Sequence, residues 1–281
     1  MRCTMKKGTL YLCPTPLGNL EDITLRVLRI LREADKIAAE DTRQTRKLLS
    51  HYGIHTPLVS YHEHNRKQRI PQLLEWLHNG ETVALVSDAG TPAIADPGEE
   101  LVKKAVAEQL TVIALPGPVA AITALSASGL PAVPFVFYGF LPPRGVQKKT
   151  ILAKILAEDK TVVFYEAPHR LRRTLAALAE ADGGRQVVVA RELTKLHETY
   201  HRGTLAEVSG YFARVEPQGE CTVILAPGIW AKEQPSADAL LAHYLSLGMP
   251  AGQAAQEVAR LTGLSRNDIY RLILAQKKEG Q

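Results

Sequence analysis

The feature that most constrains the fold is a regular alternation, in the first half of the chain, of short apolar runs with amphipathic segments of about ten residues. The expected strands are residues 9–13, 36–39, 58–61, 82–87 and 111–115. The expected helices are residues 23–34, 42–51, 70–78, 99–108 and 119–128. Parallel neighbouring strands need a long crossover connection, so this alternation predicts parallel βαβ units and an α/β fold.

A second α/β set follows residues 129–134, where dense proline and glycine are typical of a boundary. Its expected strands are 135–139, 161–165, 186–190 and 221–225, and its expected helices are 148–156, 170–181 and 205–212. After a linker over 227–235, short amphipathic helices at 237–246, 251–262 and 265–276 resemble a helix-turn-helix. The sequence therefore predicts α/β domains over 1–130 and 131–230 and a helical segment over 231–281.

The composition is that of an ordinary globular protein, with 46% hydrophobic and 22% charged residues among 281. No apolar run approaches the roughly 20 residues of a membrane-spanning helix, and the apolar run near the N-terminus is too short for a signal peptide. We therefore expect a cytoplasmic protein. Cys3, Cys13 and Cys221 lie far apart, which favours small buried side chains over a metal or redox site.

Positive charge gathers in two stretches, within a net charge of +5. The first stretch holds Arg43, Arg46, Lys47, Arg66, Lys67 and Arg69. The second holds Arg144, Lys148, Lys149, Arg170, Arg172 and Arg173. Solvated helix faces and a surface that follows nucleic-acid phosphates both fit this distribution, and charge alone leaves the two open.

Loops of proline, glycine and small polar residues follow three of the expected parallel strands. They are residues 14–19, 87–92 and 116–120. Ligands bind beyond the carboxyl ends of the strands in open parallel sheets, and small residues let the backbone approach a ligand closely. Ordinary tight turns explain one such loop, but three at one sheet edge predict a shared ligand site.

Several familiar signatures are missing from the sequence. The first strand is not followed by GxGxxG, and no GxxxxGK[ST], HExxH or GxSxG motif occurs. We therefore expect neither a dinucleotide fingerprint nor a metal site. Pattern and spacing alone indicate a two-domain α/β ligand-binding protein without specifying a reaction.

Six short motifs in order add a resemblance that periodicity cannot supply. They are residues 14–19 (Pro-Thr-Pro-Leu-Gly-Asn), 39–43 (Ala-Glu-Asp-Thr-Arg), 87–92 (Ser-Asp-Ala-Gly-Thr-Pro), 116–118 (Pro-Gly-Pro), 139–142 (Gly-Phe-Leu-Pro) and 165–170 (Tyr-Glu-Ala-Pro-His-Arg). Over about residues 8–230 the chain resembles the tetrapyrrole (corrin/porphyrin) methylase superfamily, and within it the branch that methylates a cytidine ribose 2′-hydroxyl in the decoding region of small-subunit ribosomal RNA. The resemblance implies a homodimer that binds S-adenosylmethionine between two α/β domains.

The resemblance also implies site residues by position. The implied cofactor contacts are Pro16, Asp88, Ala89, Gly90, Thr91, Ile94, Val119, Ala120, Glu166 and Leu196. The basic stretches supply candidate RNA contacts, namely Arg43, Arg46, Lys47, Arg66, Lys67, Arg170 and Arg173. The chain departs from the superfamily in its first loop, which is Pro-Thr-Pro instead of glycine-rich, and at Thr91, where the superfamily has an aspartate. Both departures fit an RNA-directed branch.

Methyl transfer to a ribose hydroxyl benefits from a general base or from a cation that stabilises the developing alkoxide. The candidates lie in residues 191–195 after a second-domain strand, chiefly Lys195 and Glu192, and in residues 40–43 after a first-domain strand, chiefly Asp41. Lys195 also fits a surface or phosphate-contacting lysine, and Asp41 also fits a helix N-cap before Thr42.

Two other functions remain alternatives at this point. A methylase acting on a small tetrapyrrole would use basic groups to hold its carboxylates, but the helical tail and the Ala39–Arg43 motif count against it. A nucleic-acid-binding protein without catalysis would use the helix-turn-helix-like tail. Binding of the methyl donor distinguishes the second alternative, and the choice of methyl acceptor distinguishes the first.

Overall fold

The structure is a computed structural model that describes residues 7–228, 237–246, 249–262, 265 and 268–269. The chain divides into two compact units, Met1–Ala226 and Pro227–Gln281. Among the described residues, every helix is too short or too polar to cross a membrane.

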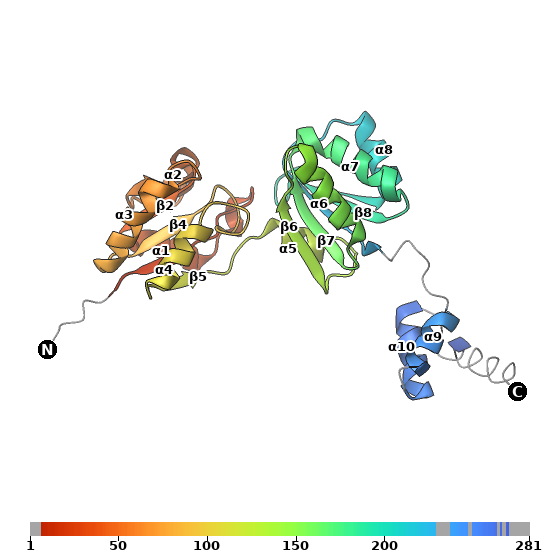
Figure 1. Ribbon diagram of the computed structural model, residues 1–281. Helices are drawn as coiled ribbons and strands as arrows, with labels where there is room; N and C mark the ends of the chain where they lie inside the picture. The colour runs from red at the N-terminus through yellow and green to blue at the C-terminus, as the bar shows by residue number, and fades with distance from the viewer. Residues whose placement is uncertain (1–6, 229–236, 247–248, 263–264, 266–267, 270–281) are drawn as a thin grey trace, which may run out of the picture. The chain divides into compact units, whose positions relative to one another are not determined.

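The first sheet of the larger unit contains five parallel strands (Figure 1). They are β1 (Thr9–Leu12), β2 (Lys36–Ala39), β3 (Leu58–Ser60), β4 (Val83–Val86) and β5 (Thr111–Ala114), in the order β3-β2-β4-β1-β5. Strand β1 lies at a switch in this order, with Leu10 paired to Val83 on one side and to Val112 on the other. The parallel arrangement predicted from the alternation is confirmed.

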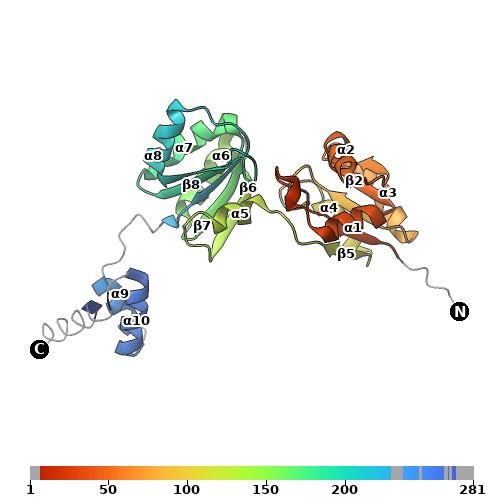
Figure 2. The same ribbon diagram turned by 180° about the vertical axis from the view of Figure 1, so that it is seen from behind.

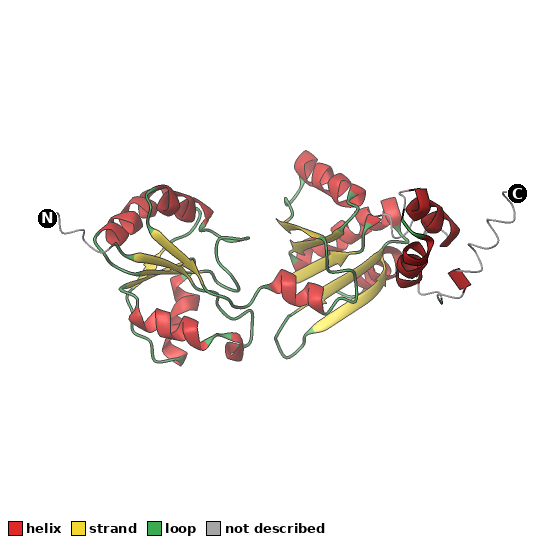
Figure 3. Ribbon diagram, turned by 90° about the horizontal axis from the view of Figure 1, so that it is seen from below, coloured by secondary structure: helices red, strands yellow, loops and turns green. Residues whose placement is uncertain are grey.

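Helices cover both faces of the first sheet, as Figure 3 shows. The helices of this part are the 3-10 turn η1 (Leu20–Asp22), α1 (Leu25–Glu33), α2 (Thr42–His51), α3 (Arg66–His78) and α4 (Glu99–Ala107). One core joins α1 and α2 to Ile37 and Ala84, whereas α3 and α4 pack on Ala38 and Leu85. Successive strand residues point to opposite faces, so burial on both sides explains why these strands read as unbroken apolar runs.

The second sheet is mixed. It contains β6 (Phe135–Phe140), β7 (Thr161–Glu166), β8 (Gln186–Arg191), β9 (Thr199–Thr204) and β10 (Cys221–Leu225), in the order β6-β7-β10-β8-β9. Strands β6 and β7 are parallel and the other pairs are antiparallel. Helices α6 (Gly145–Ala157), α7 (Pro168–Asp182) and α8 (Leu205–Arg214) share one core with the sheet.

The opposite face of the second sheet is covered by α5 (Ala120–Ser126), which follows β5 in the chain. Ala121, Ala124 and Leu125 pack against Val163 and Ile224, and α5 lies beside β6 and β7 in both Figure 1 and Figure 2. The domain boundaries drawn from the sequence stay a prediction. The packing of α5 favours a boundary at the end of β5 over one at residue 130.

Within the described residues, the helices and strands expected from the sequence are present with ends shifted by a few residues, and β9 is the one strand that was not expected. Strand β9 was not expected, because Thr-Tyr-His-Arg-Gly-Thr is a polar edge strand without an apolar run. Helix α3 begins at Arg66, four residues before the predicted start at Ile70. The prediction relied on apolar spacing, and the first turn of α3 is basic and contributes no apolar residue to that pattern.

The smaller unit contains α9 (Ala237–Ser246) and α10 (Ala251–Thr262). Leu241, Ala254, Ala255 and Val258 form its core together with Ile269. Most of the linker expected over 227–235, and most of the helix expected over 265–276, lie outside the described residues.

Candidate functional site

The loops after β1, β4 and β5 are joined to one another at the carboxyl edge of the first sheet. Thr15 and Gly90 exchange both backbone hydrogen bonds at 2.9 Å, and the Thr15 hydroxyl donates to the Ser87 carbonyl at 3.0 Å. The Thr91 hydroxyl donates to the carbonyl of Pro118 at 3.0 Å. Gly90 has a φ of +80°, which a residue with a side chain adopts only with strain. The structure therefore brings together the loops that were predicted to share an edge.

The segment after β2 joins the same edge. The backbone N–H of Asp41 donates to Oδ1 of Asp88 at 3.0 Å, so the end of β2 is tied to the loop after β4. The Asp41 side chain points the other way and accepts hydrogen bonds from the backbone and guanidinium of Arg43, at 2.7 to 3.1 Å. Asp41 is thus the N-cap of α2, and Arg43 holds the pKa of its carboxyl down to about 2.

A cavity of about 350 Å³ opens within the larger unit, between these loops and the loops of the second sheet. The residues that line it from the first half of the chain (up to residue 120, with the first sheet) are Leu17, Glu40, Asp88, Ala89, Gly90, Thr91, Ile94, Ala95, Asp96, Val119 and Ala120. Its second-half lining is Phe140, Tyr165, Glu192, Leu193, Lys195, Glu220, Cys221 and Thr222. The volume falls in the range typical of small-molecule sites, and the lining combines apolar walls with a few charged groups.

The first-half side of the cavity is acidic. Burial, together with the neighbouring charges of Asp96 and Asp88, raises the pKa of Glu40 to about 7, against a hydrogen bond from the Asp88 backbone that lowers it. Burial likewise raises the pKa of Asp96 to about 6, although the Ser87 hydroxyl donates to it. Clustered and partly desolvated carboxylates resist ionisation, and a bound cation would relieve this repulsion.

The second-half side carries a strained loop and a cation. Glu192 and Thr194 have φ angles of +50° and +65°, values that non-glycine residues seldom adopt outside functional sites. Nζ of Lys195 lies 3.0 Å from Oε1 of Glu192, and both side chains line the cavity. The loops of the first sheet therefore bring carboxylates to the cavity, whereas the loops of the second sheet bring the Lys195 ammonium together with the carboxylates of Glu192 and Glu220.

Most of the implied cofactor contacts line this cavity, but three do not. Those in the lining are Asp88, Ala89, Gly90, Thr91, Ile94, Val119 and Ala120. Pro16 is outside the lining and its neighbour Leu17 takes the place. Leu196 is 93% exposed, and Glu166 is fully buried.

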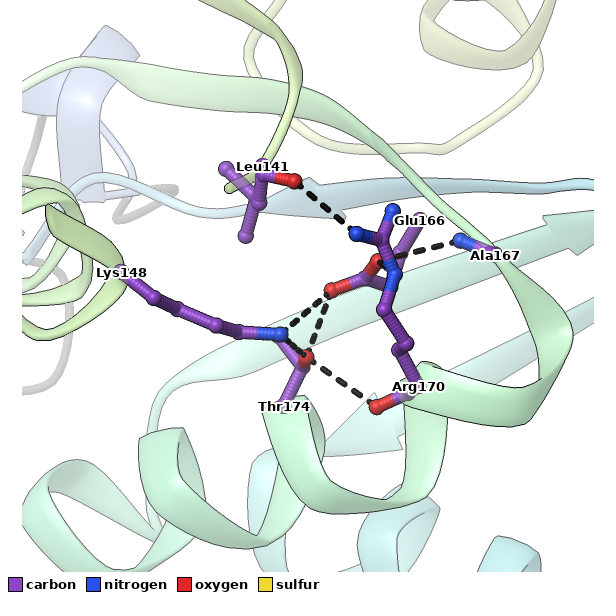
Figure 4. A network of polar contacts seen from close by, with 6 residues as sticks. All are labelled: Leu141, Lys148, Glu166, Ala167, Arg170 and Thr174. Atoms are coloured by element: carbon purple, nitrogen blue, oxygen red, sulfur yellow. Dashed lines mark hydrogen bonds and ion pairs between the residues drawn. The ribbon is translucent and has the colours of Figure 1, made fainter. Parts of the chain in front are cut away.

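Glu166 is engaged on the helical side of the second sheet (Figure 4). Its carboxylate accepts hydrogen bonds from Nζ of Lys148 at 2.9 Å and from the hydroxyl of Thr174 at 2.6 Å. Oε1 also pairs with Nε of Arg170 at 2.7 Å and accepts the N–H of Ala167 at 3.1 Å. These contacts use the carboxylate within the protein, so the structure gives Glu166 a structural position.

Among the candidate RNA contacts, the structure distinguishes free from engaged side chains. Arg46, Lys47, Lys67 and Arg173 are exposed on α2, α3 and α7. Arg43 is exposed but bound to Asp41, and Arg66 pairs with Glu63 and Glu100. Arg170 donates to the Leu141 carbonyl at 3.3 Å and pairs with Glu166, which leaves it the least available.

Several lining residues were missed by sequence reasoning. Glu40 directly follows β2 and belongs to the predicted segment 40–43, in which Asp41 was chosen instead, so strand alternation was the signal that could have selected Glu40. Asp96 lies in the loop after β4, beyond the Ser87–Pro92 motif, and Glu220 precedes β10. Tyr165 alternates with Glu166 along β7, and its hydroxyl accepts the N–H of Ala121 at 3.1 Å. Among the described residues, His, Cys, Asp and Glu side chains form no group that could hold a metal ion.

The family description "Tetrapyrrole (Corrin/Porphyrin) Methylases" matches residues 9–209, which include both sheets apart from β10. The chain belongs to the tetrapyrrole methylase family. A second description, "RsmI C-terminal HTH domain", matches residues 231–277, the part that was expected to resemble a helix-turn-helix.

Curated relatives match nearly the whole chain. "Ribosomal RNA small subunit methyltransferase I" of Halalkalibacterium halodurans is 47% identical over 274 residues, which is 95% of this chain and 94% of the relative. The protein of the same name from Bacillus subtilis is 45% identical over 94% of this chain and 93% of its own length. That from Mesorhizobium japonicum is 44% identical over 95% and 92%.

Solved structures of the tetrapyrrole methylase fold are more distant. Diphthine synthase superposes with a TM-score of 0.63 at 15% identity, over 78% of this chain and 90% of its own. A cobalt precorrin-4 methyltransferase superposes with a TM-score of 0.58 at 18% identity, over 80% and 96%. At this identity the likeness establishes the fold alone.

Proposed function

We propose that this chain is an S-adenosylmethionine-dependent methyltransferase that methylates the 2′-hydroxyl of a cytidine ribose in small-subunit ribosomal RNA. The observation that carries the proposal is the match over nearly the whole chain to proteins named for small-subunit ribosomal RNA methylation. The tail description and the exposed cations of α2 and α7 agree with an RNA acceptor. The proposal includes a homodimer, as the resemblance implies, and a cytoplasmic location, as expected from the sequence.

The cavity suits S-adenosylmethionine by its chemistry. The cofactor supplies an electrophilic methyl group on a positively charged sulfonium. Glu40, Asp88 and Asp96 offer negative charge, and Ile94, Leu17 and Val119 offer apolar walls beside the peptide groups of the small-residue loops. Clustered carboxylates with raised pKa values favour a cationic ligand, because its charge relieves their mutual repulsion. We assign cofactor binding to these loops.

We assign activation of the acceptor hydroxyl to the Glu192–Lys195 pair. Lys195 is 42% exposed and ion-paired, so it lacks the desolvated setting that turns a lysine into a base. Its ammonium is suited to stabilise the oxygen anion of the ribose hydroxyl, while the Glu192 carboxylate accepts the hydroxyl proton. Asp41 caps α2 and is given no part in proton transfer.

Lys195→Ala tests this assignment. We expect methyl transfer to small ribosomal subunits to fall at least a hundredfold, with donor affinity by calorimetry within about threefold of wild type, because the substitution removes the cation assigned to the acceptor and leaves the donor-binding loops unchanged. Lys160→Ala is a matched control, since Lys160 is 43% exposed and pairs with Asp159 at 2.9 Å. Near-normal turnover of Lys195→Ala would remove Lys195 from the mechanism.

The acceptor is tested separately. With labelled donor, we expect methylation of small ribosomal subunits and none of uroporphyrinogen. A tetrapyrrole carries several carboxylates, and the acidic side of the cavity would repel them. Primer-extension mapping in cells with and without the protein locates the methylated ribose. Label transferred only to the macrocycle would replace the proposed acceptor.

A further inference from the structure

The side chain of Lys195 lies across a glycine from the first-half loop after β1. A Cβ atom added to Gly18 would overlap Cγ of Lys195, and it would lie 2.8 Å from Cε and 3.0 Å from Cδ. The whole stem of the lysine therefore passes over the space that a side chain at position 18 would fill. Gly18 itself is exposed, and its backbone lies outside the left-handed region, so the turn does not require glycine.

The backbone that carries Lys195 has little freedom to adapt. The N–H of Lys195 donates to the carbonyl of Glu192 at 3.0 Å, and the N–H of Glu198 donates to the carbonyl of Lys195 at 3.1 Å. The Glu198 carboxylate also accepts the N–H of Thr194 at 2.5 Å. With the loop held at these points, an obstacle at position 18 displaces the lysine side chain and leaves the loop in place.

The partner of Lys195 is also seated on a glycine. A Cβ added to Gly219 would overlap the carboxylate of Glu192 and would lie 2.9 Å from its Cγ. Gly219 has a φ of +71°, so its glycine is explained by the turn as well as by the contact. Gly18 lacks that second explanation, and the space taken by Lys195 accounts for it.

We propose that Gly18 is a positioning residue that sets the place of the Lys195 ammonium in the cavity. The inference rests on the proposed function, in which Lys195 faces the reacting hydroxyl. An alanine at position 18 moves the ammonium away from Glu192 and leaves the carboxylates of Glu40 and Asp96 in place. A displacement of about 1 Å in a reacting group can cost up to about a hundredfold in rate.

Gly18→Ala is the test, and Gly184→Ala is its matched control. Gly184 is also exposed, lies outside the left-handed region and has open space where a Cβ would stand. We expect kcat of Gly18→Ala to fall at least tenfold, with donor affinity by calorimetry and KM for the ribosomal subunit within about threefold of wild type. Gly184→Ala should match wild type in all three quantities. A kcat of Gly18→Ala within twofold of wild type would overturn the proposal.

A second measurement reports the lysine without relying on activity. Acetylation by acetic anhydride, followed by mass spectrometry with Lys160 as the internal reference, should label Lys195 several-fold faster in Gly18→Ala than in wild type or Gly184→Ala. Unchanged labelling with a reduced kcat would mean that the glycine acts by another route, and would also overturn the proposal. If Lys195→Ala itself keeps normal turnover, the proposed catalytic role fails, and the labelling still decides whether Gly18 seats the lysine.

Discussion

The two sheets of the larger unit contribute different groups to one cavity, because only the second sheet adds a lysine to its carboxylates. The first sheet offers carboxylates on loops that are locked by backbone hydrogen bonds, such as the Thr15–Gly90 exchange. The second offers a half-exposed lysine on a loop with strained backbone at Glu192 and Thr194. The difference indicates a division of labour, in which the first sheet holds a cationic donor and the second addresses the acceptor.

The sheets also differ in how they hold their carboxylates. The first sheet has its carboxylates at the cavity edge, where they are partly desolvated and poorly paired. The second sheet buries Glu166 completely, with Lys148, Arg170 and Thr174 around it. A buried carboxylate that is fully ion-paired fixes structure, whereas a carboxylate without an ion-pair partner is available to a cationic ligand.

The largest expected effect comes from removing Glu166. In Glu166→Ala, Lys148 and Arg170 lose their partner while remaining largely buried, so the free energy of unfolding should fall by about 3 to 5 kcal/mol. Urea denaturation measures this change. The control is Glu63→Ala, which breaks the more exposed pair with Arg66 and should cost at most about 1 kcal/mol. Unchanged stability together with lost donor binding would mean that Glu166 contacts the cofactor, and would contradict the structural role given to it.

Glu40→Gln tests the acidic side through pH. The pKa of Glu40 is raised to about 7 and that of Asp96 to about 6, so both protonate as the pH falls from 8 to 5. Since the charged forms attract a cation, donor affinity of the wild type should weaken several-fold over this range. Glu40→Gln should bind the donor more weakly at pH 8 and show a flatter pH profile by calorimetry. A wild-type affinity that is independent of pH would contradict the role of these carboxylates.

Glu40→Gln, which should weaken donor binding, should increase the stability of the free protein. A carboxyl whose pKa is raised in the folded state binds more protons folded than unfolded, so its contribution to stability falls as pH rises from about 4.5 to about 7. Without donor, Glu40→Gln should therefore be more stable than wild type at pH 8, by on the order of 1 kcal/mol after solvent screening. Glu33→Gln, at an exposed pair with Arg29, is the control and should change stability little. A less stable Glu40→Gln would mean that the carboxylate is satisfied in the free protein.

The sequence predicts those parts of the fold and of the site that depend on local sequence patterns, and it does not predict those that depend on contacts between distant segments. The parallel sheet follows from apolar runs and crossover lengths, and the small-residue loops indicate the cavity edge, because both are properties of local sequence. Strand β9 escapes because a polar edge strand needs no apolar pattern. The raised pKa values of Glu40 and Asp96 could not be predicted, because desolvation depends on neighbours from distant segments. Gly18 escapes for the same reason, since only the fold shows that Lys195 covers it.

The smallest expected effect concerns the exposed cations. Replacing Arg46 and Lys47 of α2 by glutamate should weaken binding to small ribosomal subunits a few-fold near physiological salt. It should also lower the slope of log affinity against log salt by about 0.7 to 0.9 for each lost phosphate contact. The control is Lys103→Glu on α4, an exposed lysine on the opposite face of the first sheet. Because neither Arg46 nor Lys47 lines the cavity, donor affinity should stay unchanged. An unchanged salt slope would leave these cations as a solvated helix face, and Arg173 of α7 would then become the next candidate for the phosphate contact.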